Sequence, residues 1–216
     1  MMTESAWPAC RDSIQMLREL RPRRGRKLEL FITACCRRHW SELPARIRRQ
    51  VELLEACAEG QVSSNRIDDE WLEFESWCAG LYETSNGAGQ GRWLAVAEIV
   101  SAGWNHDFES YEPDYPSEVQ HGRRQERERQ ADLVRDIFGN PFRPVAVDPA
   151  WLAWNGGTVP AIAHRVYAER AFHDLPILAD ALEDAGCTNA DLLSHCRGGG
   201  EHVRGCWAVD LLLGRT

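Results

Sequence analysis

The sequence lacks long apolar runs. No stretch approaches the roughly 20 apolar residues that a helix needs to cross a bilayer, and residues 1–11 lack the basic-then-apolar order of a secretory signal. We therefore expect no membrane association and a cytoplasmic location. In that reducing compartment the eight cysteines are expected to be thiols or metal ligands rather than disulfides.

Recognisable catalytic motifs are also lacking. The sequence contains no dinucleotide fingerprint, no His-Glu-x-x-His and no nucleophile elbow. The glycine tract at 198–200 is not followed by Lys-Ser/Thr, so it is not a phosphate-binding loop. These absences argue against an enzyme, although an enzyme of unknown chemistry is one of the alternatives considered below.

Lysine is nearly absent, because Lys27 is the only one and arginine supplies almost all of the positive charge. Residues 1–50 hold twelve basic and five acidic side chains, whereas residues 51–116 hold two basic and fourteen acidic ones. The net charge of -8 is therefore strongly polarised along the chain. Arginine favours planar, multidentate contacts with carboxylates and phosphates, so this polarity points to charged partners within or outside the chain.

Apolar residues recur at intervals of three and four along most of the chain. Leu28, Phe31, Ile32 and Cys35 show this spacing, which is typical of one face of an amphipathic helix. Asp12 or Ser13 and Asn189 are candidate caps, residues 86–91 are interpreted as a loop, and 203–213 as a final helix. The sequence therefore predicts an all-α protein, a compact irregular bundle or array of about eight or nine helices.

The acidic, aromatic and proline-bearing segment 105–116 is the best candidate boundary between two halves. It divides the chain into an N-terminal helical lobe, 1–110, and a C-terminal helical lobe, 111–216. The C-terminal lobe contains a connector rich in Pro, Gly and Trp at 141–157. A single domain is the alternative at this length.

Several segments resemble a family of uncharacterised bacterial proteins. They are RDIFGNPFRP at 135–144, DPAWL at 148–152, LPILADALE at 175–183 and HVRGCW at 202–207. Cys35, Cys36, Arg37, Arg38 and Trp40 look similar as well. The resemblance implies a bacterial, cytoplasmic origin and transfers no catalytic residue.

A cluster of thiols and imidazoles near the C-terminus is the strongest chemical candidate. It comprises Cys187, His195, Cys196, His202 and Cys206. Thiolates and imidazoles suit tetrahedral zinc, and a helix starting at His202 would place it on one face with Cys206. The alternative is that Cys187 and Cys206 are small core residues and that His202 bonds to the backbone, since the spacing matches no familiar zinc finger.

The arginines near the N-terminus are candidates for binding an anion or a partner. They are Arg23, Arg24, Arg26, Arg37 and Arg38. Phosphate groups of a nucleic acid are one ligand for such a set. The alternative is that these side chains pair with the acidic 51–116 segment of the same chain or of a neighbour.

The sequence therefore favours a non-enzymatic module that binds a protein partner through a helical surface. Its nine tryptophans and polarised charge suit recognition surfaces. A zinc-stabilised nucleic-acid-binding or regulatory module is the second hypothesis, and an enzyme of unknown chemistry is the third. No cofactor is expected apart from a structural zinc ion in the second case.

Overall fold

The structure is a computed structural model, and it describes residues 2–22, 25–63, 76–77, 80, 87–105 and 114–215. These segments contain ten α-helices, three short 3-10 helices and no strand, which confirms the predicted all-α array. The chain forms two compact units, Met1–Val134 and Arg135–Thr216. Among the described helices, none has both the length and the apolar character needed to cross a membrane.

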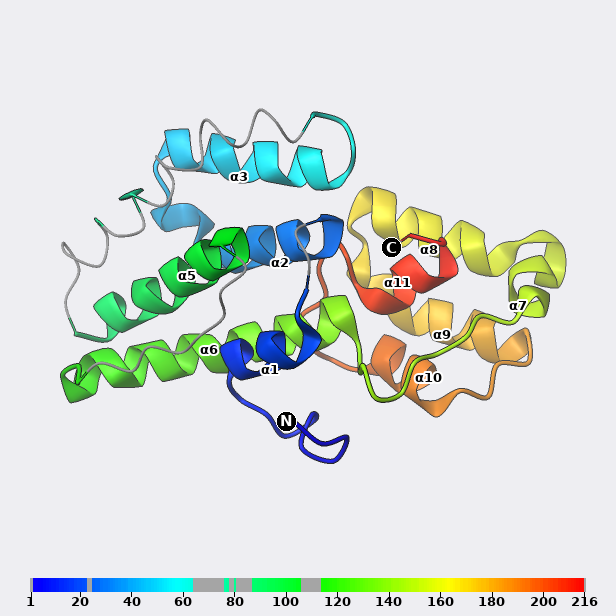
Figure 1. Cartoon of the computed structure of the whole chain (residues 1–216). Coiled ribbons are helices and arrows are strands. Elements are labelled where there is room, and N and C mark those ends of the chain that lie inside the picture. Colours follow the sequence, from blue (N-terminus) through cyan, green and yellow to red (C-terminus); the bar gives the residue numbers. More distant parts are fainter. Residues whose placement is uncertain are drawn as a thin grey trace. The chain divides into compact units, whose positions relative to one another are not determined.

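The helices of the first unit are α1 (Ser13–Leu20), α2 (Arg26–Arg37), η1 (Trp40–Glu42), α3 (Ala45–Ala58), α5 (Gly87–Asn105) and the first part of α6 (Ser117–Phe138). Helix α2 packs against both α3 and α5 (Figure 1). Its residues Leu28–Cys36 are all buried, so α2 is the central helix of this unit. Burying so many side chains of one helix requires neighbours on more than one side.

Helix α1 begins where the sequence predicted. The Asp12 carboxylate accepts hydrogen bonds from the backbone N–H groups of Ile14 and Gln15, at 2.9 and 3.2 Å. The helix ends at Leu20, and the backbone of the following residue, Arg21, is left-handed. Asp12 is therefore the N-cap, and it satisfies donors that otherwise have no partner within the helix.

Helix α5 begins at Gly87, so the interpretation of 86–91 as a loop is wrong for residues 87–91. The reason lies in the packing of α5 against α6. A Cβ added to Gly91 would lie 1.8 Å from the Val119 carbonyl oxygen, and one added to Gly122 would lie 2.0 Å from that of Ala88. The two backbones meet at glycines on both sides, and this tertiary contact outweighs the low helix propensity of glycine.

The two compact units divide within helix α6, after Val134, whereas the sequence placed its candidate boundary near residue 110. Residues 106–113 lie outside the described part of the chain. Helix α6 continues without a break through Arg135 to Phe138. A helix can span a boundary in this way because its backbone hydrogen bonds are local.

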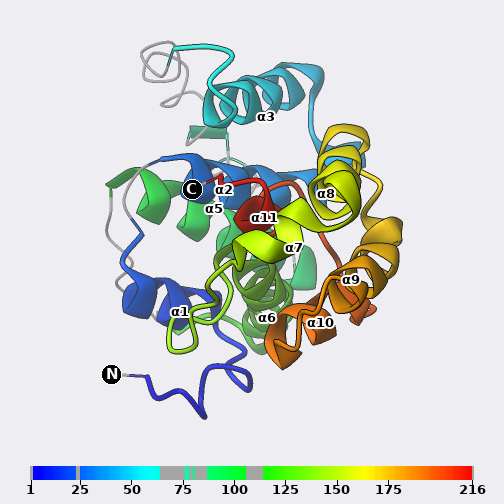
Figure 2. The ribbon, with the colours of Figure 1, turned by 90° about the vertical axis from the view of Figure 1, so that its right-hand side faces the viewer.

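The helices of the second unit are the end of α6, α7 (Pro149–Ala153), η2 (Trp154–Gly156), α8 (Thr158–Glu169), η3 (Phe172–Asp174), α9 (Leu175–Asp184), α10 (Ala190–Arg197) and α11 (Trp207–Leu212). Helix α9 packs between α8 and α10, and α11 packs against α8 (Figure 2). Val159, Leu178, Leu192 and Val209 lie in one buried apolar cluster contributed by these four helices. The second unit therefore has a hydrophobic core of its own.

The last helix is shorter than predicted, since α11 begins at Trp207 and not near residue 203. Gly205 has a φ of 96°, and the Cys206 N–H donates to the Val203 carbonyl at 3.0 Å. This turn precedes the helix, so His202 and Cys206 do not share a helical face. Positive φ suits glycine, and it redirects the chain before α11 starts.

Candidate metal centre

Asp136 lies in the last turn of α6 and is almost completely buried. A carboxylate is disfavoured at this end of a helix, where the carbonyl groups carry negative partial charge. The chain turns at Gly139, whose φ is 69° and whose N–H donates to the Arg135 carbonyl at 3.1 Å. Asp136 therefore needs positive or hydrogen-bonding partners from elsewhere in the fold.

His195 supplies one partner from the last turn of α10. Asn189 caps this helix by accepting the Leu192 N–H at 2.9 Å, as predicted. His195 Nε2 lies 3.3 Å from Asp136 Oδ1, and its ring lies 5.0 Å from that of Trp207. An imidazole is well placed at a helix C-terminus, where its protonated form interacts favourably with the helix dipole.

His202 follows the glycine tract 198–200 and contacts Asp136 more closely. Its Nδ1 lies 2.7 Å from Asp136 Oδ1, and its Nε2 lies 3.3 Å from the Gly198 carbonyl oxygen. The backbone N–H of Val203 donates to Asp136 Oδ2 at 2.9 Å. The carboxylate thus holds both the imidazole and the backbone of the loop that follows α10.

Cys206 completes the group as the N-cap of α11. Its Sγ lies 3.1 Å from His195 Nε2, and its side chain is fully buried. The turn at Gly205 brings the thiol back toward α10. One Asp, two His and one Cys from three separate helix termini and a loop therefore meet at one place.

The four groups form a donor set suited to zinc. The set contains one ligand atom from each of Asp136, His195, His202 and Cys206. These four atoms all lie within 4.8 Å of one another. Donors around a tetrahedral zinc ion lie roughly 3.3–3.7 Å apart, as follows from bond lengths of about 2.0–2.3 Å. The contacts of His195 with Cys206 and Asp136, at 3.1 and 3.3 Å, are already near that spacing.

Asp136 and His202 each shift the pKa of the other. Burial raises the pKa of Asp136, but hydrogen bonds from His195 and His202 outweigh it and hold the pKa below its ordinary value. Burial lowers the pKa of His202, but the hydrogen bond and the charge of Asp136 raise it above its ordinary value. The site therefore favours an ionised carboxylate beside a protonated imidazole.

Burial and the negative charge of Asp136 raise the pKa of Cys206 well above its ordinary value, although N–H groups of Val209 and Ala208 oppose the shift. The thiol is therefore protonated at neutral pH in the absence of a cation. A bound metal ion reverses this preference, because a coordinated thiol is deprotonated.

A Cys-His-Asp set also has the composition of a nucleophilic triad, but the geometry differs from one. His195 contacts both Cys206 and Asp136 through the same atom, Nε2. A triad histidine uses one nitrogen for the nucleophile and the other for the carboxylate. A reactive cysteine also needs a lowered pKa and access to substrate, whereas Cys206 is buried and its pKa is raised.

Two of the five predicted metal-site residues lie outside this group of four. Cys187 and Cys196 belong to the buried apolar cluster of the second unit. Burial, with the nearby Cys187 and Asp136, raises the pKa of Cys196 to about 12. Their surroundings match the role of small core residues, which was the stated alternative for Cys187.

Asp136 is the member of the site that sequence reasoning missed, although it lies in the quoted segment 135–144. One sequence signal could have found it. Leu133, Val134 and Ile137 form the apolar side of α6 and are fully buried, and Asp136 follows Leu133 by three residues. A carboxylate on the apolar face of a helix requires a buried partner.

The described members of the predicted anion-binding set of arginines lie close to glutamates. Arg26 lies 3.6 Å from Glu59, Arg37 pairs with Glu55, and Arg38 lies 3.7 Å from Glu126. Arg23 and Arg24 lie outside the described residues. Arg26 and Arg37 thus face glutamates of the acidic 51–116 segment, which agrees with the stated alternative, whereas Arg38 faces Glu126, outside that segment.

Comparison of the chain with protein-family models, curated proteins and solved structures finds no match. The resemblance of the quoted segments to a bacterial family therefore stays a prediction, and the functional argument depends on the site itself.

Proposed function

We propose that the protein is a zinc-stabilised, non-enzymatic interaction module whose second unit holds one zinc ion through Asp136, His195, His202 and Cys206. The convergence of these four donors is the observation that carries the proposal. Four protein ligands leave no open coordination position, and closed sites of this kind are structural rather than catalytic. The donor set of one carboxylate, two imidazoles and one thiol also argues against magnesium and calcium, because these ions prefer oxygen ligands.

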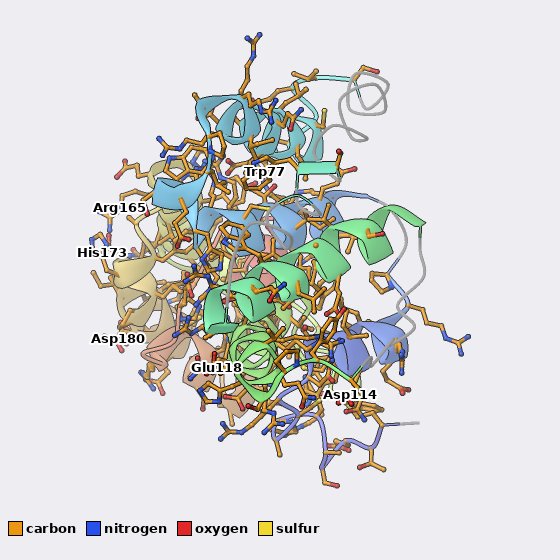
Figure 3. All side chains as sticks on the ribbon, turned by 90° about the vertical axis from the view of Figure 1, so that its left-hand side faces the viewer. Trp77, Asp114, Glu118, Arg165, His173 and Asp180 are labelled. Carbon is orange, nitrogen blue, oxygen red and sulfur yellow. The ribbon has the colours of Figure 1, made fainter. Side chains whose placement is uncertain are left out.

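Metal analysis of the purified full chain, expressed without a tag, tests this proposal. We expect about one zinc per chain in the wild type, and less than about a tenth of an equivalent in His195→Ala or Cys206→Ser. His173→Ala is the matched histidine control, because the His173 side chain is 83% exposed and lies at the outer edge of the view in Figure 3. Cys187→Ser is the cysteine control.

Each outcome has a clear reading. Zinc retained in both controls and lost in both ligand variants supports the four-residue site. Zinc lost in Cys187→Ser would show that the ligand set differs from the one proposed. A wild-type protein purified with less than about a tenth of an equivalent, and unable to take up added zinc, would refute the proposal.

The pairing of Arg26, Arg37 and Arg38 with glutamates favours a protein partner over a nucleic acid. A guanidinium group that already faces a glutamate contributes little net positive field to a phosphate backbone. We therefore expect the full chain to show no binding to duplex DNA or to RNA that weakens as salt is raised. Binding that falls steeply between low and physiological salt would instead support the nucleic-acid alternative.

A further inference from the structure

The four donors of the proposed zinc site already satisfy one another through hydrogen bonds. Asp136 accepts from the Val203 N–H and pairs with His202 Nδ1, His195 Nε2 contacts the Cys206 thiol, and His202 Nε2 lies 3.3 Å from the Gly198 carbonyl. Buried polar groups are costly only when they lack partners. The hydrogen-bonded arrangement is therefore a stable alternative to the metal-bound one.

The second unit also has a hydrophobic core that can stabilise its fold without a metal ion. Seventeen buried residues from α8, α9, α10, α11 and their connections form its apolar cluster, and Cys206 is the only one of the four donors among them. Classical zinc fingers unfold without metal because they have no comparable core. A unit with this core can keep its helices when the donors are free of metal.

The two imidazoles are the most exposed members of the site. The side chains of His195 and His202 are 17% and 9% exposed, whereas that of Asp136 is 3% exposed. The imidazoles therefore form the outer side of the site, and the carboxylate and thiol form its floor. A metal ion can approach past the two rings without unfolding the helices that carry the deeper donors.

Metal binding requires a change at His202. Both of its ring nitrogens are engaged, one with Asp136 and the other with Gly198, and at least one of these contacts must be given up to a metal ion. Gly199 and Gly200, which precede His202, are surrounded by open space, because a Cβ added to either would meet nothing within 4 Å. Residues 198–206 are thus the part of the unit that responds.

We propose that the centre is exchangeable and regulatory: the second unit is folded with or without zinc, and zinc switches the loop 198–206 from the hydrogen-bonded arrangement to a metal-bound one. This inference rests on the proposed function, since it assumes that the four donors bind zinc. It adds that zinc changes the conformation of the loop and is not required for the unit to fold.

Hydrogen–deuterium exchange of the full chain, compared between chelator-treated and zinc-loaded protein, tests the inference. We expect the same helical circular dichroism signal and the same protection of α8 and α9 in both states. Within 198–206 we expect exchange to slow by at least about tenfold when zinc is added, and to recover when zinc is removed. His202→Ala should abolish this response, whereas His173→Ala should leave it intact.

The outcomes separate this inference from the function on which it rests. Zinc binding accompanied by loss of helical signal or of α8 and α9 protection on chelation would show an obligate structural ion, and would overturn the inference while leaving the proposed function in place. Zinc binding with unchanged exchange at 198–206 would also overturn it. Failure of the wild type to bind zinc at all would overturn both.

Discussion

Replacing Asp136 by asparagine tests the electrostatic account of the site most directly, because the change removes a charge and keeps an acceptor of the same shape. Breaking a buried, hydrogen-bonded charge set by altering one partner costs about 3–5 kcal/mol. Asparagine retains one carbonyl oxygen for the Val203 N–H or His202, so the lower end applies. We expect a loss of about 3 kcal/mol in the free energy of unfolding at pH 5.5.

The loss should depend on pH in a definite direction. The folded pKa of Asp136 lies below its ordinary value of 3.8, so its contribution is present above pH 3.8 and is lost as pH falls through the folded pKa. The folded pKa of His202 lies above its ordinary value of 6.5, so its contribution is present below pH 6.5 and is lost as pH rises through the folded pKa. The pair is therefore strongest between about pH 4 and 6.5.

At a pH above the folded pKa of His202 the imidazole is neutral, and asparagine then replaces a carboxylate that accepts hydrogen bonds without a cationic partner. We expect the loss there to fall to about 1.5 kcal/mol. Urea unfolding followed by circular dichroism, with a chelator present throughout, measures both values. The exposed Asp184 offers a matched control on α9, and Asp184→Asn should change stability by less than about 0.5 kcal/mol at either pH. An equal loss at pH 5.5 and at a pH above the folded pKa of His202 in Asp136→Asn would refute the reasoning.

Three further predictions concern the fold and are measured by urea or thermal unfolding. Gly122→Ala should destabilise the first unit by at least about 2 kcal/mol, because its Cβ would lie 2.0 Å from the Ala88 carbonyl oxygen. Gly89→Ala should be neutral or stabilising, because its Cβ would meet nothing within 4 Å. A similar cost for both variants would contradict the packing argument. Asn189→Ala should cost about 1 kcal/mol by removing the cap of α10, and Asn189→Ser should restore most of it. Leu178→Ala should cost about 2–5 kcal/mol because Leu178 is fully buried, whereas Ile177→Ala, at a position that is 50% exposed, should cost much less.

The sequence predicted those parts of the fold that local chemistry determines. Asp12 and Asn189 cap α1 and α10 because an Asp or Asn side chain reaches N–H groups only two or three residues ahead. The apolar spacing from Leu28 to Cys36 likewise predicted α2, since the periodicity of a helix is repeated in every turn. Such signals need no knowledge of the rest of the chain.

Other features depend on contacts between distant residues and could not be read in this way. The start of α5 at Gly87 depends on the approach of α6, which the glycines of one helix alone do not reveal. Three members of the proposed metal site, His195, His202 and Cys206, were named from residue type, but Asp136 lies 66 residues before His202. Residue type also failed to separate Cys206 from Cys187 and Cys196, because all three thiols are buried and only geometry distinguishes a donor from a core residue.

The absence of a side chain at Gly139 affects the proposed centre through Trp207. A Cβ there would lie 3.2 Å from the Trp207 ring, and that ring in turn packs 5.0 Å from His195. A larger residue would push the indole toward the imidazole and so shift a ligand without touching it. The geometry of the proposed zinc site therefore also depends on the absence of a side chain at Gly139, three positions after Asp136.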